Sequence, residues 1–149
     1  MKEDQLKTAF GFFNEIGIIN QLATSLFNRQ LPDGLHVSHF SVLNHLVRLG
    51  DGVTPLQLAR AFQVTKGTMT HTLNGLSDKK LIKIQPHKTD GRSKLVYITG
   101  EGKAFQQKAI KSMGPLFDKL KDELDLTSLA RLSPELSRIR AVLDQNRDI

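Results

Sequence analysis

Small and hydrogen-bonding side chains fill the stretch between residues 65 and 74, and basic side chains follow between residues 88 and 94. The first group is Thr65, Lys66, Gly67, Thr68, Thr70, His71 and Asn74, and the second is Lys88, Arg92 and Lys94. Hydroxyl, amide and imidazole groups on a helix suit the hydrogen-bonding edges of base pairs in the major groove. Lysine, arginine and the N–H groups at a helix start suit phosphate. The two groups therefore predict contacts with double-stranded DNA.

A helix over 66–80 is expected to give the first group a common face. Its inward side is expected to hold Met69, Leu73 and Leu76. The opposite side then carries Gly67, Thr70, His71, Asn74 and Gly75, because each helical residue turns the chain by about 100°. On this face Asn74 suits an adenine edge and His71 a guanine edge, while Gly67 lets the backbone approach the groove closely.

Two stretches rich in β-branched and aromatic residues, 81–85 and 94–98, predict the strands of a hairpin joined by the loop 86–93. Arg92 near its tip is expected to enter the minor groove, where negative potential is concentrated. Asp90 would repel phosphate. We therefore expect Asp90 to accept hydrogen bonds within the turn and to orient Arg92 through a short-range pair.

The charge distribution agrees with a polyanion partner. The 149-residue chain has a formal net charge of +6. Residues 65–103 hold eight basic and three acidic side chains, so five of these six net charges lie in about a quarter of the chain.

The elements that must position these residues can be predicted from apolar spacing and from breakers. Helices are expected over 6–29, 37–49, 101–124 and 128–146, with a short helix from Thr54 to Phe62. The expected N-caps are Ser38, Thr54, Thr65 and Thr99. Gly114-Pro115 should kink or break the helix 101–124, and Pro134 could shift the boundary of the last helix. The fold class is therefore mainly α with a small β-hairpin wing, a winged helix-turn-helix.

In this order of elements, the stretch from Phe40 to Ala104 resembles the MarR family of bacterial regulators. The matching motifs are Thr54-Pro55-Leu56-Gln57-Leu58-Ala59, Val64-Thr65-Lys66-Gly67-Thr68-Met69-Thr70, Leu76-Ser77-Asp78-Lys79-Lys80-Leu81-Ile82, Asp90-Gly91-Arg92-Ser93-Lys94 and Ile98-Thr99-Gly100-Glu101-Gly102. The resemblance implies a winged-helix homodimer that binds a pseudo-palindromic operator, usually as a repressor. His71 departs from the family, which often has a basic residue there.

The two ends of the chain are expected to pair two copies. We expect residues 1–149 to form a single MarR-like domain, with the winged helix-turn-helix at 36–103 and dimerisation helices at 4–30 and 104–147. The apolar faces of 6–29 and 116–143 are too large for a wing-sized core to cover, and two such faces exposed on a monomer would be a liability.

A small-molecule effector is a further expectation, because similar family members release DNA when a ligand fills a pocket beside the dimerisation helices. Phe10, Phe13, His39 and Phe40 are the candidate lining, although plain core packing explains the phenylalanines better. The sequence also leaves open a winged protein-interaction module and a metal-responsive regulator that uses the histidines.

Other classes receive no support from the sequence. The chain has no cysteine, which excludes disulfides, thiol redox sensing and cysteine-rich zinc sites. No phosphate-binding loop, nucleophile elbow or metal-ligand cluster is present, so we expect no enzyme, no cofactor and no bound metal. No apolar run is long enough to span a membrane, and no signal region opens the chain, so a cytoplasmic protein is expected.

Overall fold

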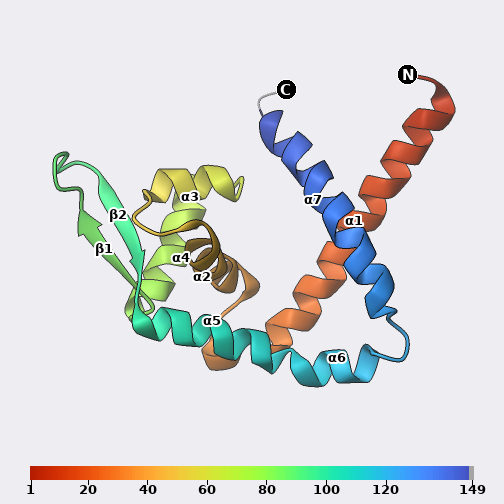
Figure 1. Cartoon of the computed structure of the whole chain (residues 1–149). Coiled ribbons are helices and arrows are strands. Elements are labelled where there is room, and N and C mark those ends of the chain that lie inside the picture. Colours follow the sequence, from red (N-terminus) through yellow and green to blue (C-terminus); the bar gives the residue numbers. More distant parts are fainter. Residues whose placement is uncertain (148–149) are drawn as a thin grey trace. The chain divides into compact units, whose positions relative to one another are not determined.

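The structure is a computed structural model that describes residues 1–147 of the chain. It divides into two compact units, residues 1–113 and the part from Gly114 onward, and each is described by itself. The first unit contains α1 (Glu3–Gln30), η1 (Pro32–Gly34), α2 (Val37–Leu49), α3 (Pro55–Ala61), α4 (Lys66–Asp78), β1 (Ile82–Pro86), β2 (Lys94–Ile98) and α5 (Gly100–Ser112), as Figure 1 shows. The second contains α6 (Gly114–Leu120) and α7 (Leu126–Gln145). The predicted class, mainly helical with one hairpin, is confirmed.

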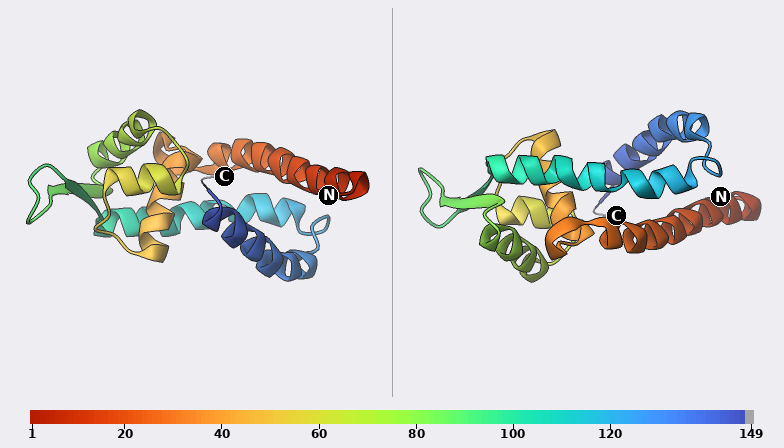
Figure 2. Two further views of the ribbon diagram at one scale, coloured as in Figure 1. Left: turned by 90° about the horizontal axis from the view of Figure 1, so that it is seen from above. Right: turned by 90° about the horizontal axis from the view of Figure 1, so that it is seen from below.

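The hairpin is a two-stranded antiparallel sheet in which Ile82 lies opposite Ile98 and Pro86 opposite Lys94. An isolated antiparallel β-bridge also pairs Val53 with Val96, on the edge of β2 that is not paired with β1. Both views of Figure 2 show the hairpin extending away from the helices of the first unit. Its base is therefore held by the chain before α3, while its loop projects as a wing.

The core of the first unit is made by apolar side chains from its helices and its hairpin. Leu43, Leu58, Leu76 and Val96 are fully buried and come from α2, α3, α4 and β2. Burying a leucine removes apolar surface from water and contributes roughly 1.5–3 kcal/mol. The predicted inward positions of α4, which are Met69, Leu73 and Leu76, are all buried.

Threonine caps begin the helices that matter for the wing. The side chain of Thr54 accepts a hydrogen bond from the N–H of Gln57, and that of Thr65 accepts one from Thr68. Thr99 does the same for α5 and also donates its hydroxyl to the carbonyl of Lys80. These three predicted caps are confirmed.

The fourth predicted cap, Ser38, is wrong. The helix α2 begins at Val37 after His36, so Ser38 already lies inside its first turn. The backbone N–H of His36 donates a hydrogen bond to the Nδ1 atom of His39, at 3.1 Å. A histidine is an unusual acceptor at this position, where glutamate or glutamine is the common choice.

The joint between α4, the hairpin and α5 leaves no space at Gly102. A Cβ atom there would stand 2.1 Å from the carbonyl oxygen of Leu81 and 2.8 Å from the side chain of Ile98. Glycine therefore lets the start of α5 pack directly against the backbone that enters β1. This contact fixes the base of the wing relative to α4.

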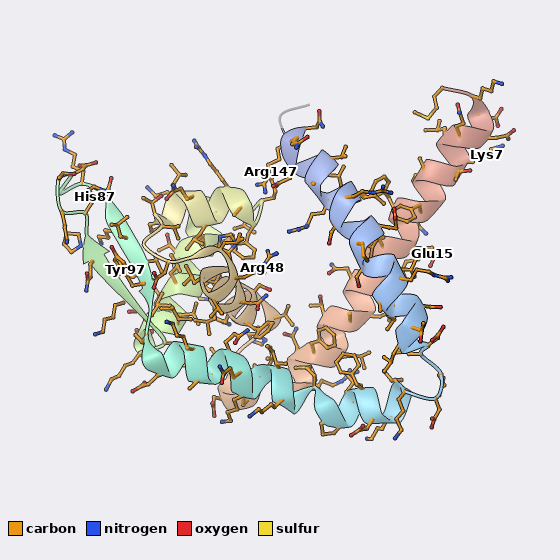
Figure 3. All side chains as sticks on the ribbon, viewed as in Figure 1. Lys7, Glu15, Arg48, His87, Tyr97 and Arg147 are labelled. Atoms are coloured by element: carbon orange, nitrogen blue, oxygen red, sulfur yellow. The ribbon has the colours of Figure 1, made fainter. Side chains whose placement is uncertain are left out.

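The helices α1 and α7 bury none of their described side chains, although both carry many apolar residues. Figure 3 shows the side chains of Lys7 and Glu15 standing out from α1. The predicted interruption near residue 114 is confirmed, since α5 ends at Ser112 and α6 begins at Gly114. Pro134 lies inside α7 without ending it. None of the helices within residues 1–147 is long and apolar enough to cross a membrane.

Candidate nucleic-acid interface

The outer face of α4 is open to solvent and polar, as its sequence predicts. The exposed residues are Thr65, Lys66, Gly67, Thr68, Thr70, His71 and Asn74. The hydroxyl of Thr70 donates to the carbonyl oxygen of Lys66 at 2.9 Å, which holds the side chain against its own helix. Asn74 lies one turn further along the same face. The face therefore offers an amide and an imidazole as donors, without an acidic group among these seven residues.

The turn between α3 and α4 sets the angle at which this face is presented. Gln63 adopts a left-handed conformation with φ +52°, and the N–H of Val64 donates to the carbonyl of Ala59 at 3.0 Å. The helices α3 and α4 pack against each other on either side of this turn. A short helix, a tight turn and a second helix with an exposed polar face form a helix-turn-helix.

The wing loop, residues 87–93, is held by two side chains of its own. The two carboxylate oxygens of Asp90 accept hydrogen bonds from the N–H of Arg92 and from the hydroxyl of Ser93, at 3.1 and 2.8 Å. The Ser93 hydroxyl and then the Arg92 N–H hold the pKa of Asp90 below its usual value. The imidazole of His87, labelled in Figure 3, accepts hydrogen bonds from the N–H groups of Thr89 and Asp90.

Asp90 thus has the predicted turn role, but it reaches Arg92 through the backbone. Among the ion pairs of residues 1–147, none joins the Asp90 carboxylate to the Arg92 guanidinium, so the expected charge pair is corrected. Asp90 is bonded to the backbone of Arg92, whose side chain is exposed together with those of Lys88 and Lys94.

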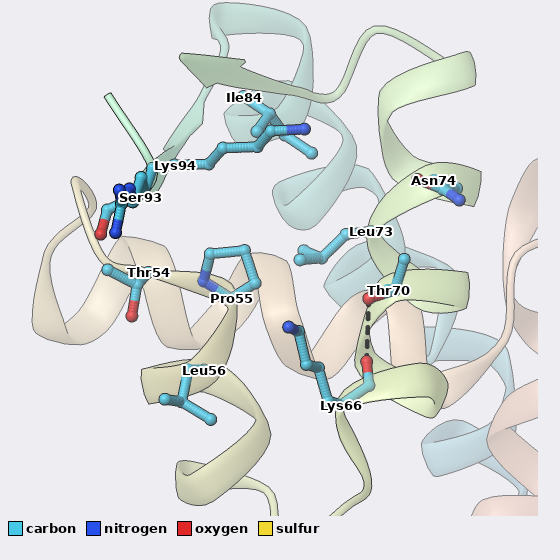
Figure 4. A pocket seen from close by; sticks show the side chains of 11 residues that line it. Thr54, Pro55, Leu56, Lys66, Thr70, Leu73, Asn74, Ile84, Ser93 and Lys94 are labelled. Atoms are coloured by element: carbon cyan, nitrogen blue, oxygen red, sulfur yellow. Dashed lines mark hydrogen bonds between the residues drawn. The ribbon is translucent and has the colours of Figure 1, made fainter. Parts of the chain in front are cut away.

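A groove of about 600 Å³ joins the α4 face to the wing. Its walls come from the start of α3, from α4 and from the hairpin, and its lining is Thr54, Pro55, Leu56, Lys66, Thr70, Leu73, Asn74, Ile84, Arg92, Ser93 and Lys94. Figure 4 shows Lys66, Thr70 and Asn74 along α4 and Lys94 from the hairpin around the same hollow. Three lining residues are basic and none is acidic. Five of the ten residues predicted to contact DNA are therefore brought together in one concave, positively charged surface.

The other five predicted contacts do not line this groove. Thr65 is the N-cap of α4, Gly67, Thr68 and His71 lie on α4, and Lys88 lies in the wing loop. Sequence reasoning missed the wall made by Thr54, Pro55 and Leu56, which it interpreted only as a helix start. The signal was present, since α3 is the first helix of the helix-turn-helix and its first turn lies at the start of the same motif.

Gly75 does not belong to the outer face, so its predicted position is corrected. It is partly buried, and a Cβ atom there would lie 2.8 Å from the Nε2 atom of His39 on α2. Burial first, and then the charges of His36, His71 and Lys79, lower the pKa of His39. His39 is therefore a packing partner of α4 in this chain.

The four residues predicted to line an effector pocket lie in different places. Phe10 and Phe13 line a groove of about 370 Å³ whose walls, with Asn14, Gly17, Ile18 and Gln21, come entirely from α1. His39 packs against α4, and Phe40 packs against the core. This groove on α1 is thus formed without the two α2 residues.

The histidines do not form a metal-binding cluster in the part of the chain that the structure describes. His36 and His39 stack with ring centroids 5.9 Å apart, and His45 lies against Phe62. Within residues 1–147 no group of three or more histidine, aspartate, glutamate or cysteine residues could hold a metal ion.

The helix-turn-helix, the polar outer face of α4 and the basic hairpin define this protein as a winged helix-turn-helix protein. Residues 33–93 match the model of the MarR family. The multiple antibiotic resistance protein MarR of Salmonella typhimurium is 29% identical over 143 residues, which cover 90% of this chain and 99% of the relative. The chain is thus similar to the MarR family of transcriptional regulators over its winged part, and to MarR itself over most of its length.

Two crystal structures of MarR from E. coli have the same fold. The wild-type apo form has a TM-score of 0.71 at 27% identity, covering 85% of this chain and 94% of the other. A mutant complexed with operator DNA has a TM-score of 0.69 at 25% identity, covering 89% and 95%.

Proposed function

We propose that this protein is a homodimeric, sequence-specific repressor that binds a pseudo-palindromic operator and is released by a small-molecule ligand. In this proposal α4 reads base edges in the major groove, and the wing places Arg92 in the minor groove. Lys66, Lys88 and Lys94 contact phosphates. The observation that carries the proposal is the single groove lined by both α4 and the wing, with three basic and no acidic residues.

The geometry of this groove suits a nucleic acid better than a protein partner. A protein-interaction surface is expected to be apolar at its centre. Here the groove-lining side chains of α4 that are exposed, Lys66, Thr70 and Asn74, are polar, and Leu73 is only 2% exposed. The exposed apolar side chain of the lining is Leu56 on α3, whereas all its charged side chains are basic. A crystallised relative binds operator DNA with the same fold. The protein-interaction and metal-responsive hypotheses have no comparable feature within residues 1–147.

Dimerisation is proposed because of the apolar side chains that the helices outside the wing leave uncovered. On α1 they include Leu6, Phe10, Ile19 and Leu22, and on α7 they include Leu129, Leu132, Leu136 and Leu143. Exposed apolar patches of this kind mark interaction sites. A two-fold dimer presents its recognition helices to half-sites roughly 34–36 Å apart. The single winged unit would otherwise read only half of a palindrome.

Release by a ligand is supported by the groove beside Phe10 and Phe13, which lies on a helix proposed to dimerise. A ligand bound there is expected to change the fit of two copies and thereby the spacing of the recognition helices. Small aromatic acids are the first compounds to titrate against a preformed complex, and displacement of DNA at a fixed ratio of ligand to dimer is the expected result.

The test of DNA binding begins with selection of bound duplexes from random-sequence DNA. Affinity for the selected duplex is then measured by fluorescence anisotropy over a range of salt concentrations. We expect a steep loss of affinity with salt, because bound lysines and arginines displace counterions from phosphates. Binding without a salt slope would contradict the phosphate contacts.

Arg92→Ala separates the contribution of the wing to DNA binding from that of α4. The variant is expected to bind the same duplex more weakly, with a salt slope reduced by about one per wing, and to remain a dimer. Lys111→Ala is the matched control, since Lys111 is an exposed basic residue at the far end of α5. Equal affinity of both variants and the wild type would remove the wing from the mechanism.

A further inference from the structure

Three helices of the first unit begin with the same backbone arrangement. In each, the side chain three residues after the N-cap accepts the N–H of the N-cap residue. Gln5 accepts from Lys2 at 3.0 Å in α1, and Gln57 accepts from Thr54 at 2.7 Å in α3. In α2 the acceptor is the Nδ1 atom of His39, which accepts from His36 at 3.1 Å. The histidine is the one acceptor of the three that a proton converts into a donor.

The same imidazole touches the recognition helix with its other nitrogen. Nε2 lies where a side chain on Gly75 would stand, 2.8 Å from the position of a Cβ atom. Because Nδ1 accepts a hydrogen bond, the proton of neutral His39 resides on Nε2, on the α4 side. One ring thus caps α2 with one edge and packs against α4 with the other.

The groups around this ring are bases. His36, the N-cap of α2, stacks on it, and His71 of α4 and Lys79, the C-cap of α4, act on it by their charges. Burial is the largest cause of the lowered pKa of His39, and these three charges lower that pKa further. Protonation of His39 therefore adds a positive charge beside three basic residues. It also breaks the hydrogen bond that Nδ1 accepts from the N–H of His36.

We propose that His39 is a proton-sensitive positioning residue, which in its neutral form caps α2 and seats the recognition helix α4, and which releases both when it is protonated. The neutral ring stabilises the fold at neutral pH. Because the pKa in the folded state lies below the ordinary value of 6.5, this contribution is complete above pH 6.5 and is lost as the pH falls through the lowered pKa. The consequence for DNA rests on the proposed function, since it assumes that α4 reads bases.

The first experiment compares the wild type with His39→Gln by thermal unfolding from about pH 7.5 to about pH 5. Glutamine accepts the N-cap N–H in α1 and α3 and does not titrate, so it preserves the cap. We expect similar melting temperatures at neutral pH and a steeper fall on acidification in the wild type. Parallel profiles would overturn the proposal.

Asn28→Ala is the matched control. The side-chain oxygen of Asn28 accepts the N–H of Val37 at 2.7 Å, so it supports the same turn of α2 without a titrating group. This variant is expected to be less stable than the wild type at every pH while keeping the wild-type slope. A changed slope in Asn28→Ala would show that any loosening of this turn produces the effect, which would contradict a specific role of His39.

A second measurement uses the wild type alone and does not depend on how His39→Gln folds. Nitrogen NMR of the ring is expected to show the Nε2–H tautomer at neutral pH and titration below the ordinary range. The Nδ1–H tautomer, or an ordinary titration, would overturn the proposal. Acidification is also expected to weaken binding of the selected duplex several-fold more in the wild type than in His39→Gln, and equal losses would contradict the link to α4. Absence of DNA binding would refute the proposed function and leave the unfolding and NMR tests intact.

Discussion

Two helices of the first unit, α4 and α1, have similar apolar spacing and opposite surroundings. In α4, a 13-residue helix, four residues are buried, namely Met69, Thr72, Leu73 and Leu76. In α1, a 28-residue helix, none is buried, and Phe10 is 71% exposed. The comparison teaches that periodicity reveals an apolar face without revealing what covers it. The core of the first unit covers α4, and we infer that a second copy covers α1.

The largest expected effect tests the α4 side of this comparison. Leu76→Ala is expected to lower the free energy of unfolding by about 2–5 kcal/mol, because it removes a fully buried side chain and leaves a cavity. Leu22→Ala on α1 is the matched control. Within one chain its side chain is 62% exposed, so the expected loss is below about 1 kcal/mol when unfolding is measured on monomers, at protein concentrations below the dissociation constant of the dimer. Urea unfolding measures both. Equal losses would mean that the two helices do not differ in how the chain covers them.

A smaller effect is expected at the joint that holds the wing to the core. Gly102→Ala is expected to cost about 1–3 kcal/mol, because its Cβ atom would clash with the carbonyl oxygen of Leu81. Gly100→Ala, two residues earlier, meets no atom within 4 Å and serves as the control in the same unfolding assay. If Gly102→Ala were as stable as Gly100→Ala, the close contact of α5 with β1 would be refuted.

The α1 side is tested by a charge on its apolar face. Phe10→Glu is expected to raise the dissociation constant of the dimer by at least about tenfold, which corresponds to about 1.4 kcal/mol. Sedimentation at several protein concentrations measures this constant. Lys7→Gln, which changes an exposed polar residue of α1, is expected to leave it unchanged. A Phe10→Glu protein with the wild-type constant would place the partner of α1 elsewhere.

The smallest effect is expected in the wing loop, which has neither core nor partner helix. Asp90→Ala is expected to speed amide exchange at Arg92 and Ser93, because two hydrogen bonds of the loop are lost. Since the pKa of Asp90 is lowered, its contribution is present above its ordinary value of 3.8 and is lost as the pH falls through the lower pKa. Asp78→Ala is the control, and equal exchange in both variants would contradict a structural role for Asp90.

Much of the fold was predictable because its signals are local. Thr54, Thr65 and Thr99 cap their helices as predicted, since a cap needs only a side-chain oxygen and the next turn of the same helix. The strand pair also follows from its own residues, with β2 placed as predicted and β1 shifted by one residue. Ser38 failed as a cap because a rarer acceptor, His39, lies one residue further along and bonds the His36 N–H.

The candidate site was predictable residue by residue but not as a surface. The sequence indicated which positions of α4 are polar and which residues of the wing are basic. It did not indicate that the start of α3 forms the third wall, or that Gly75 turns toward His39. Both depend on the angles at which helices cross, and these angles follow from packing between residues distant in the chain.

The sequence alone determined the order of elements, the three threonine caps, the inward face of α4 and the concentration of positive charge. These properties depend on neighbours within a few residues or on composition. The tertiary structure alone decided that Lys66, Asn74 and Arg92 share one groove. The tertiary structure also decided that the imidazole of His39 contacts both the start of α2 and Gly75 of α4. The physical reason is that packing and long-range hydrogen bonds select among partners that the local pattern leaves equivalent.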